Sequence, residues 1–313
     1  MKKIWLDELK QEKKKAVSGG GSKEYVDANI QAAQQMARGL GPDAADDAEP
    51  GAGAGVRIVF NMACKHVSSL CEPGETYKNA YDANTIGAKR KGVDSAVQAA
   101  AKTIGVTLPA KKIYFGAVET SGSGIRFYGD MCLVLKVRPG FVSDSRPQVA
   151  DKELLVLDRN SYDVIRAPIV AAVKNNTAAG APLLNAQSQQ LLQWMGVWDK
   201  DLLSLIALKV LHQLSLGERR WTTGQIAQTI LVDEDYIEVL YPKSFVANEI
   251  EEVRLTAADV AAEADIAAKE ANGEAPLPEE AEWRRQRRKA RRALAQAAIP
   301  VRVVLTAGRI KAS

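Results

Sequence analysis

The order of its strand-like and helix-like segments constrains the fold of this chain more than any other feature. Runs rich in branched and aromatic residues indicate strands at 56–63, 113–119, 125–137, 153–158, 235–242, 250–256 and 299–308. Apolar residues at helical spacing indicate helices at 93–104 and 186–217. Because strands and helices do not alternate along the chain, a doubly wound parallel sheet is disfavoured. We therefore predict an α+β fold with a mostly antiparallel sheet and flanking helices.

Three local features refine this prediction. The strands at 113–119 and 125–137 flank the small-residue turn TSGSG and should pair as an antiparallel hairpin. The helix at 93–104 should begin at a cap provided by Asp94 or Ser95. Residues 257–299 are rich in Ala, Glu and Arg, and they should form a helical hairpin broken near GEAPLP, inserted before the last strand.

Composition divides the chain into an arm, a linker and one domain. Residues 1–38 are dominated by Ala, Gln, Lys and Glu and read as helical, with a break at 18–22. The stretch 39–55, GLGPDAADDAEPGAGAG, is predicted to be a flexible linker because it is rich in Gly, Pro, Ala and Asp. Residues 56–313 are predicted to form a single domain that contains the helical insertion at 257–299.

The small number of cysteines and histidines limits the chemistry. The chain has three cysteines and two histidines, without a CxxC spacing, which argues against a disulfide framework and a zinc site. No apolar h-region follows the basic N-terminus, and no apolar run approaches the roughly 20 residues of a membrane helix. We therefore predict a cytoplasmic protein with no membrane partner and no metal.

Familiar catalytic motifs do not occur in the sequence. The turn at 120–124 matches neither GxxxxGKS nor GxGxxG, and no helix follows it, so P-loop and Rossmann interpretations are poor. There is no GxSxG elbow. The sequence leaves open a Ser/His/Asp triad, which would have to use His66 or His212 as its base. His212 lies in an apolar helix and is interpreted as a packed core residue.

The segment DYIEVLYPKSFVANEIEEVRLT, residues 235–256, is the most informative for function. It places Glu238 on a short strand that is followed by a turn and a second strand. Side-chain alternation puts Ile237 and Val239 on one face of the strand and Glu238 on the other. From the residues alone, Glu238 is either a catalytic carboxylate or an exposed strand glutamate.

YIEVL followed by NEIEEVRL resembles the end of ADP-ribosyltransferase domains in bacterial toxins. Upstream, YKNAYDANTIGAKR (77–90) and KKIYFGAVETSGSGIRFYGDMCLVLKV (111–137) resemble an uncharacterised bacterial family with that presumed core. The resemblance covers residues 56–165 and 225–256, with 300–307 as a final strand. It implies an ADP-ribosyltransferase-like split sheet, mostly antiparallel, and NAD as the substrate.

The resemblance gives Glu238 a chemical role. Breaking the nicotinamide–ribose bond builds positive charge on the ribose, and a fixed carboxylate stabilises this oxocarbenium-like state. The same carboxylate could help to deprotonate an acceptor. Tyr236 stands two residues earlier, where arginine-modifying members carry Glu and several others carry Gln. Tyr236 is thus a candidate NAD contact, and the chain does not resemble a standard arginine-specific enzyme.

Five further residues receive NAD-binding roles from the resemblance. Tyr77 and Tyr81 would stack on the nicotinamide ring, and Arg126 would meet the pyrophosphate. Arg57 and Asn61 lie on the first strand, where the superfamily keeps an NAD-binding Arg or His, although the family histidine itself is missing here. Core packing of the tyrosines and a solvated position for Arg126 are the alternatives.

A basic block, RRQRRKARR at 284–292, holds seven cations in nine residues. On a helix these cations would cover roughly half of the circumference and attract a phosphate backbone, while Trp283 could stack on a base. The candidate nucleic-acid contacts are Arg284, Arg285, Arg287, Arg288, Arg291 and Arg292, and Lys289 belongs to the same stripe of cations. The alternative is a solvated helix face that pairs with the acidic residues at 262–282.

Two main functional hypotheses follow. The first is an NAD-dependent ADP-ribosyltransferase, a bacterial toxin or phage-defence enzyme that modifies nucleic acid (RNA or DNA) or protein. A toxin would need restraint by an antitoxin or chaperone protein, for which the arm at 1–38 is a docking candidate. The second is a non-enzymatic structural or interaction protein of phage origin. An NAD glycohydrolase, with water as the acceptor at the same site, is a third hypothesis.

Overall fold

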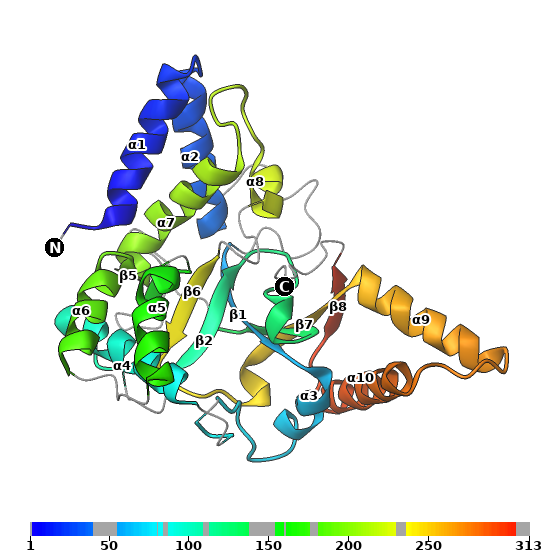
Figure 1. The fold of residues 1–313 in the computed structure, drawn as a ribbon. Coiled ribbons are helices and arrows are strands. Elements are labelled where there is room, and N and C mark those ends of the chain that lie inside the picture. The colour runs from blue at the N-terminus through cyan, green and yellow to red at the C-terminus, as the bar shows by residue number, and fades with distance from the viewer. Residues whose placement is uncertain are drawn as a thin grey trace. The chain divides into compact units, whose positions relative to one another are not determined.

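The computed structural model contains helices and strands that belong to two compact units (Figure 1). It describes residues 2–39, 55–79, 81–83, 87–108, 113–137, 154–159, 161–175, 181–229 and 236–304. The first unit comprises residues 1–56, 78–116 and 139–244, and the second comprises 57–77, 117–138 and 245–313. Each unit is built from three separate segments of the chain.

The first unit holds three strands that are covered by helices. The strands are β4 (Leu155–Asp158), β5 (Met195–Val197) and β6 (Ile237–Tyr241). The helices beside them are α4 (Ala88–Thr103), α5 (Ser161–Lys174), α6 (Ala181–Leu192) and α7 (Trp198–Gln213). β4 is the middle strand and pairs antiparallel with both β5 and β6. Apolar side chains of α4, α5, α6 and the strands form one buried core, which fixes the position of β6.

A helical hairpin at the N-terminus belongs to this first unit. It consists of α1 (Ile4–Ser18) and α2 (Lys23–Arg38), which lie beside α7 and α8 (Thr223–Thr229) (Figure 1). The predicted break at 18–22 is confirmed, and the Ser22 side chain caps α2 by accepting from the backbone N–H of Tyr25. Trp5 and Val26 are fully buried, so the hairpin contributes to the core of the unit.

The second unit is built on five strands in the order β2-β1-β3-β7-β8. Their bounds are β1 (Arg57–Met62), β2 (Tyr114–Glu119, of which 117–119 belong here), β3 (Met131–Leu135), β7 (Ile250–Thr256) and β8 (Val301–Val304). The pairs β1–β2, β1–β3 and β3–β7 are antiparallel, and β7–β8 is parallel. The mixed but mostly antiparallel pairing confirms the predicted α+β class, whereas the ADP-ribosyltransferase-like split stays a prediction.

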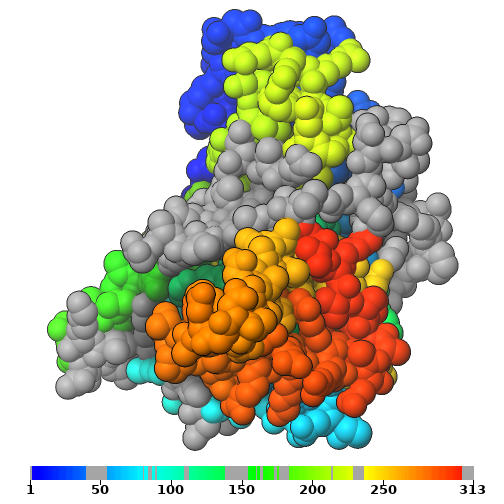
Figure 2. All heavy atoms as spheres, turned by 90° about the vertical axis from the view of Figure 1, so that its right-hand side faces the viewer, coloured from blue at the N-terminus to red at the C-terminus, as the bar shows by residue number. Residues whose placement is uncertain are grey.

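Three helices and two short 3-10 turns complete the second unit. They are α3 (Cys64–Leu70), η3 (Arg126–Tyr128), η4 (Ala247–Glu249), α9 (Ala257–Ala271) and α10 (Pro278–Gln296). The predicted helical hairpin at 257–299 is confirmed, since α9 and α10 are separated by a turn at GEAPLP. α10 begins with a proline, which suits the first turn of a helix, and it packs against α3. Figure 2 shows α9 and α10 side by side at the surface, with α3 next to α10.

Several local predictions are wrong, among them the strand expected from residue 125, where the 3-10 turn η3 precedes β3. Strands β2 and β3 do not form a hairpin, because β1 pairs with both of them. α4 begins at Ala88, with Gly87 at its cap position, so neither Asp94 nor Ser95 caps it. Asp94 instead lies inside α4 and forms an ion pair with Arg90. Of the predicted linker at 39–55, residues 40–54 lie outside the described residues.

Candidate functional site

Glu238 occupies the second position of β6 and is almost completely enclosed. Its side chain retains 5% exposure, and across the strand pair it stands opposite Leu157 of β4. All five residues of β6 are buried, so both faces of the strand are covered. Glu238 is therefore not an exposed strand glutamate, and its carboxyl group needs polar partners inside the unit.

The partners of Glu238 come from α5 and α4. The hydroxyl of Tyr162 on α5 donates a short hydrogen bond to the Glu238 carboxylate. Arg90 on α4 is close enough for its positive charge to act on both groups, and its guanidinium is 2.8 Å from the carboxylate of Asp94. Tyr81 hydrogen-bonds to Asp94 as well. We call these five residues the Glu238 cluster: Tyr81, Arg90, Asp94, Tyr162 and Glu238.

Burial controls the protonation of this cluster. Desolvation raises the pKa of Glu238 to about 7, although the Tyr162 hydrogen bond and the positive charges of Arg90 and Arg159 act in the opposite direction. The pKa of Tyr162 lies well above its usual value, first because of burial and second because of the Glu238 charge. At neutral pH Glu238 is consequently divided between its acid and its carboxylate forms.

A carboxyl group with a pKa near 7 can both give and take a proton. A general acid or base is most effective when its pKa lies near the working pH, and enzymes tune glutamates to this range by burial. The Tyr162 hydroxyl holds one carboxylate oxygen in place, because Tyr162 is itself anchored against the core of α4, α5 and α6. The cluster is therefore fitted for acid–base or electrostatic chemistry. Glu238 lines neither the cavity of about 1010 Å³ beside α10 nor the cavity of about 680 Å³ beside α1 and α7.

Of the predicted NAD contacts, two share the first unit with Glu238. Tyr81 is half-buried and belongs to the Glu238 cluster through Asp94. Tyr236 is buried two residues before Glu238. Its carbonyl accepts a hydrogen bond from the backbone N–H of Arg159 at 3.1 Å. These two positions are compatible with a role near Glu238.

The other four predicted contacts belong to the second unit, where each has structural partners. The Arg57 guanidinium is buried, donates to the Leu135 carbonyl at 2.7 Å and pairs with Glu251. Arg126 pairs with Asp259 at the start of α9. These contacts join β1 to β3 and β7 and join η3 to α9, and they occupy both guanidinium groups.

Asn61 and Tyr77 also have structural partners within the second unit. The Asn61 amide donates to the carbonyls of Ser123 and Gly129 and accepts from the Ile125 N–H, so it holds the loop before β3. The Tyr77 ring stacks on Phe245 with centroids 4.7 Å apart. The alternative reading of Tyr77, packing at the edge of the core, therefore describes its environment.

The basic block lies within α10, and its side chains are distributed over an inner and an outer face of this helix. On the inner face, fully buried Arg287 bonds to Asp130 at 2.9 Å and to Glu263 at 3.2 Å, and Arg291 also pairs with Glu263. Trp283 donates to Asp130 and packs against Arg287, so its ring is part of this inner network. Arg284 pairs with Glu270, and Arg285 pairs with Glu282.

Sequence reasoning missed Arg90, Asp94 and Tyr162 as partners of Glu238. Arg90 and Asp94 are four residues apart, a spacing that places opposite charges side by side on a helix, so this pair could have been found. Tyr162 is 76 residues from Glu238, and only the packing of α5 against β4 and β6 brings the two together.

Comparisons with known proteins give no relative to set beside this geometry. No family model, no curated protein and no solved structure matches the chain. Within the described residues, no helix has the length and apolar character needed to cross a membrane. The same residues contain no group of three or more His, Cys, Asp or Glu side chains arranged to hold a metal ion.

Proposed function

We propose that this chain is an NAD-dependent ADP-ribosyltransferase in which Glu238 carries the chemistry. The observation that supports this proposal is a buried glutamate on a sheet strand, held by a tyrosine hydroxyl and poised between its two protonation states at neutral pH. In its carboxylate form, Glu238 would stabilise the positive charge that grows on the ribose as the nicotinamide bond breaks. Tyr162 would orient the carboxylate.

Tyr81 and Arg90 are the residues of the cluster best suited to meet the dinucleotide. Tyr81 offers a half-buried aromatic ring for the nicotinamide. The Arg90 side chain is 41% exposed, but it is ion-paired with Asp94, so it would meet the phosphates only in exchange for that pair. A toxin or phage-defence role, with an antitoxin or chaperone as partner and nucleic acid or protein as acceptor, belongs to the same proposal. An NAD glycohydrolase would use the same residues with water as acceptor.

The proposal is tested by incubating the protein with labelled NAD and separate pools of DNA, RNA and protein. We expect nicotinamide release and transfer of label to one pool, and a loss of at least 100-fold with Glu238→Gln, the order of magnitude for removing one main electrostatic group. Glu274→Gln, at an exposed position in the turn after α9, is the matched control and should keep full activity. Intact NAD and no labelled pool would contradict the enzymatic function.

A pH profile distinguishes a chemical role of Glu238 from a structural one. Because the carboxylate is the active form, kcat/KM should rise through about pH 7, the pKa of Glu238 in the free protein. Release of free ADP-ribose without transfer of label to the DNA, RNA or protein pool would favour the glycohydrolase.

A non-enzymatic structural or interaction protein is the second candidate. It is favoured by the structural partners of Arg57, Asn61, Tyr77 and Arg126, which leave four expected NAD contacts engaged elsewhere. On this alternative the Glu238 cluster would only satisfy buried polar groups, and NAD would remain unchanged in the assay above.

A further inference from the structure

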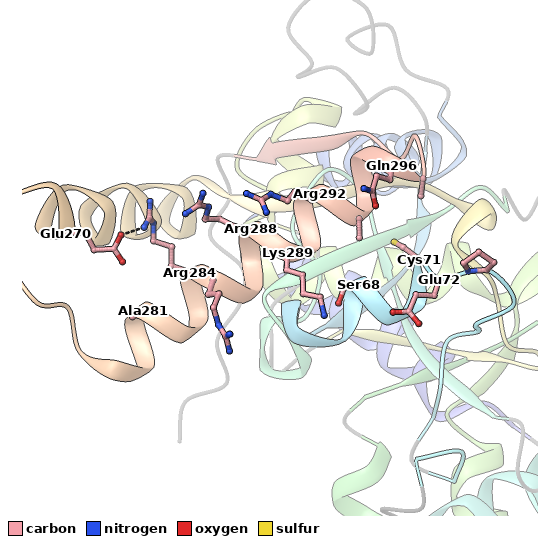
Figure 3. A pocket seen from close by; sticks show the side chains of 14 residues that line it. Ser68, Cys71, Glu72, Glu270, Ala281, Arg284, Arg288, Lys289, Arg292 and Gln296 are labelled. Atoms are coloured by element: carbon pink, nitrogen blue, oxygen red, sulfur yellow. Dashed lines mark hydrogen bonds and ion pairs between the residues drawn. The ribbon is translucent and has the colours of Figure 1, made fainter.

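A groove of about 1010 Å³ runs along the outer face of α10 in the second unit (Figure 3). α10 supplies one wall, and the end of α3 with the turn after it supplies the other. Five cations line the groove, and two carboxylates, Glu72 and Glu270, accompany them. Glu270 is already paired with Arg284. The lining is therefore strongly basic.

Three of the five cations carry the argument. Arg288, Lys289 and Arg292 are exposed, and the described part of the chain contains no ion pair to any of them. Arg288 and Arg292 are four residues apart and lie on one side of α10, while Lys289 extends toward Ser68 and Glu72 of the α3 side (Figure 3). Their charges remain available to a ligand, unlike those of Arg287 and Arg291 on the inner face.

We infer that this groove binds the phosphate backbone of a single-stranded nucleic acid. A row of uncompensated cations in a concave groove attracts a polyanion and releases its counterions. Because α10 packs against both α3 and α9, it does not stand free to enter the major groove of a duplex. No aromatic side chain lines the groove. The contacts would therefore be made to phosphates, which carry no sequence information, and binding should not depend on base sequence.

The inference rests on the second unit alone and does not depend on the proposed chemistry of Glu238. If both hold, single-stranded nucleic acid is the acceptor class that this surface would recruit. If NAD proves inert, the groove would still bind its ligand, so the two proposals fail separately.

Binding is measured by fluorescence anisotropy with a labelled 12-nucleotide oligothymidine and the full chain. With three phosphates neutralised, the single-strand slope of about −0.7 per contact predicts a roughly 20-fold loss of affinity between 50 and 200 mM salt. Arg288→Gln/Lys289→Gln/Arg292→Gln should remove most of this salt dependence. The matched control, Lys14→Gln/Lys102→Gln/Arg166→Gln, removes the same charge from exposed positions of the first unit and should bind like the wild type.

Two further measurements separate a specific groove from general charge or misfolding. Glu72→Gln removes a carboxylate from the lining and should tighten binding, a gain that a damaged fold does not give. Cys71 lines the groove and is half-buried, whereas Cys64 and Cys132 are buried. The oligothymidine should therefore slow alkylation of Cys71 and leave the other two cysteines as internal references.

Several outcomes would overturn the inference. They are equal binding by the groove variant and the wild type, no binding at 50 mM salt, tighter binding of a 12-base-pair duplex, or equally tight binding of a polyglutamate peptide of the same charge. Failure of the oligothymidine to protect Cys71 would show that the ligand binds elsewhere and would overturn it as well.

Discussion

At the scale of single residues, Glu238 should give the chain an unusual dependence of stability on pH. Its pKa is raised from 4.5 to about 7, so the folded chain keeps a proton that the unfolded chain releases. The associated contribution to the free energy of unfolding is fully present below about pH 4.5 and is lost as the pH rises through about 7. This sign is opposite to that of a carboxylate stabilised by an ion pair.

We therefore expect the wild type to lose up to about 3 kcal/mol between pH 5 and pH 8 relative to Glu238→Gln, which resembles the protonated side chain. Urea unfolding of both proteins at the two pH values measures this difference. Glu274→Gln, which changes an exposed position in the turn after α9, should follow the wild type. Parallel pH dependence of the wild type and Glu238→Gln would show that the buried carboxyl does not titrate in this range.

The sequence could identify Glu238 but not its surroundings. Strand alternation predicts the face on which a side chain lies, yet it does not say whether another layer covers that face. Both faces of β6 are covered, and the polar partner on the Glu238 face is Tyr162 of α5, which is distant in sequence. Asp94 shows why the cap prediction is wrong: aspartate is suited both to cap a helix and to pair with an arginine inside it, and here it pairs with Arg90.

At the scale of elements, segments defined by local patterns were predicted well, and pairings between distant strands were not. The break between α1 and α2 and the turn between α9 and α10 follow from Gly, Ser and Pro in the sequence. The supposed hairpin of β2 and β3 failed because β1 pairs between them. Short turns favour hairpins, but a strand that precedes both in sequence can insert between them without any local signal.

One buried amide links α2 of the N-terminal hairpin to the segment between α7 and α8. Asn29 of α2 is 1% exposed, donates to the carbonyls of Leu216 and Arg219 at 2.8 Å and accepts from the Trp221 N–H. Asn29→Ala leaves these three main-chain groups without their partner, so we expect a loss of about 2–3 kcal/mol in the free energy of unfolding. Gln31→Ala, at an exposed position of the same helix, should change it by less than about 0.5 kcal/mol.

Chemical denaturation followed by circular dichroism measures both variants. A near-neutral Asn29→Ala would mean that water replaces the side chain and that α2 is held by its apolar contacts alone. It would also support the hypothesis that residues 1–38 detach to meet an antitoxin or chaperone.

At the scale of the whole molecule, the two units are interleaved along the chain. The boundaries at 56/57, 77/78, 116/117, 138/139 and 244/245 carry the chain from one unit to the other five times, and the boundary at 116/117 falls within β2. Neither unit is a continuous segment that could fold while the rest of the chain stays free. This connectivity favours a single cooperative unfolding transition over two independent ones.

A destabilising substitution in the second unit tests this expectation. Arg287 is fully buried between Asp130 and Glu263, and Arg287→Met removes one partner from two carboxylates, which should cost about 3 kcal/mol. The exposed pair of Arg285 with Glu282 makes Arg285→Met the matched control, with an expected change below about 0.5 kcal/mol. If unfolding is cooperative, hydrogen exchange in Arg287→Met should accelerate in the slowest peptides of both units, including β4 and β6. Acceleration limited to β3, β7 and α10 would instead show that the second unit opens alone. The five crossings of the chain between the two units would then not be enough to couple their unfolding.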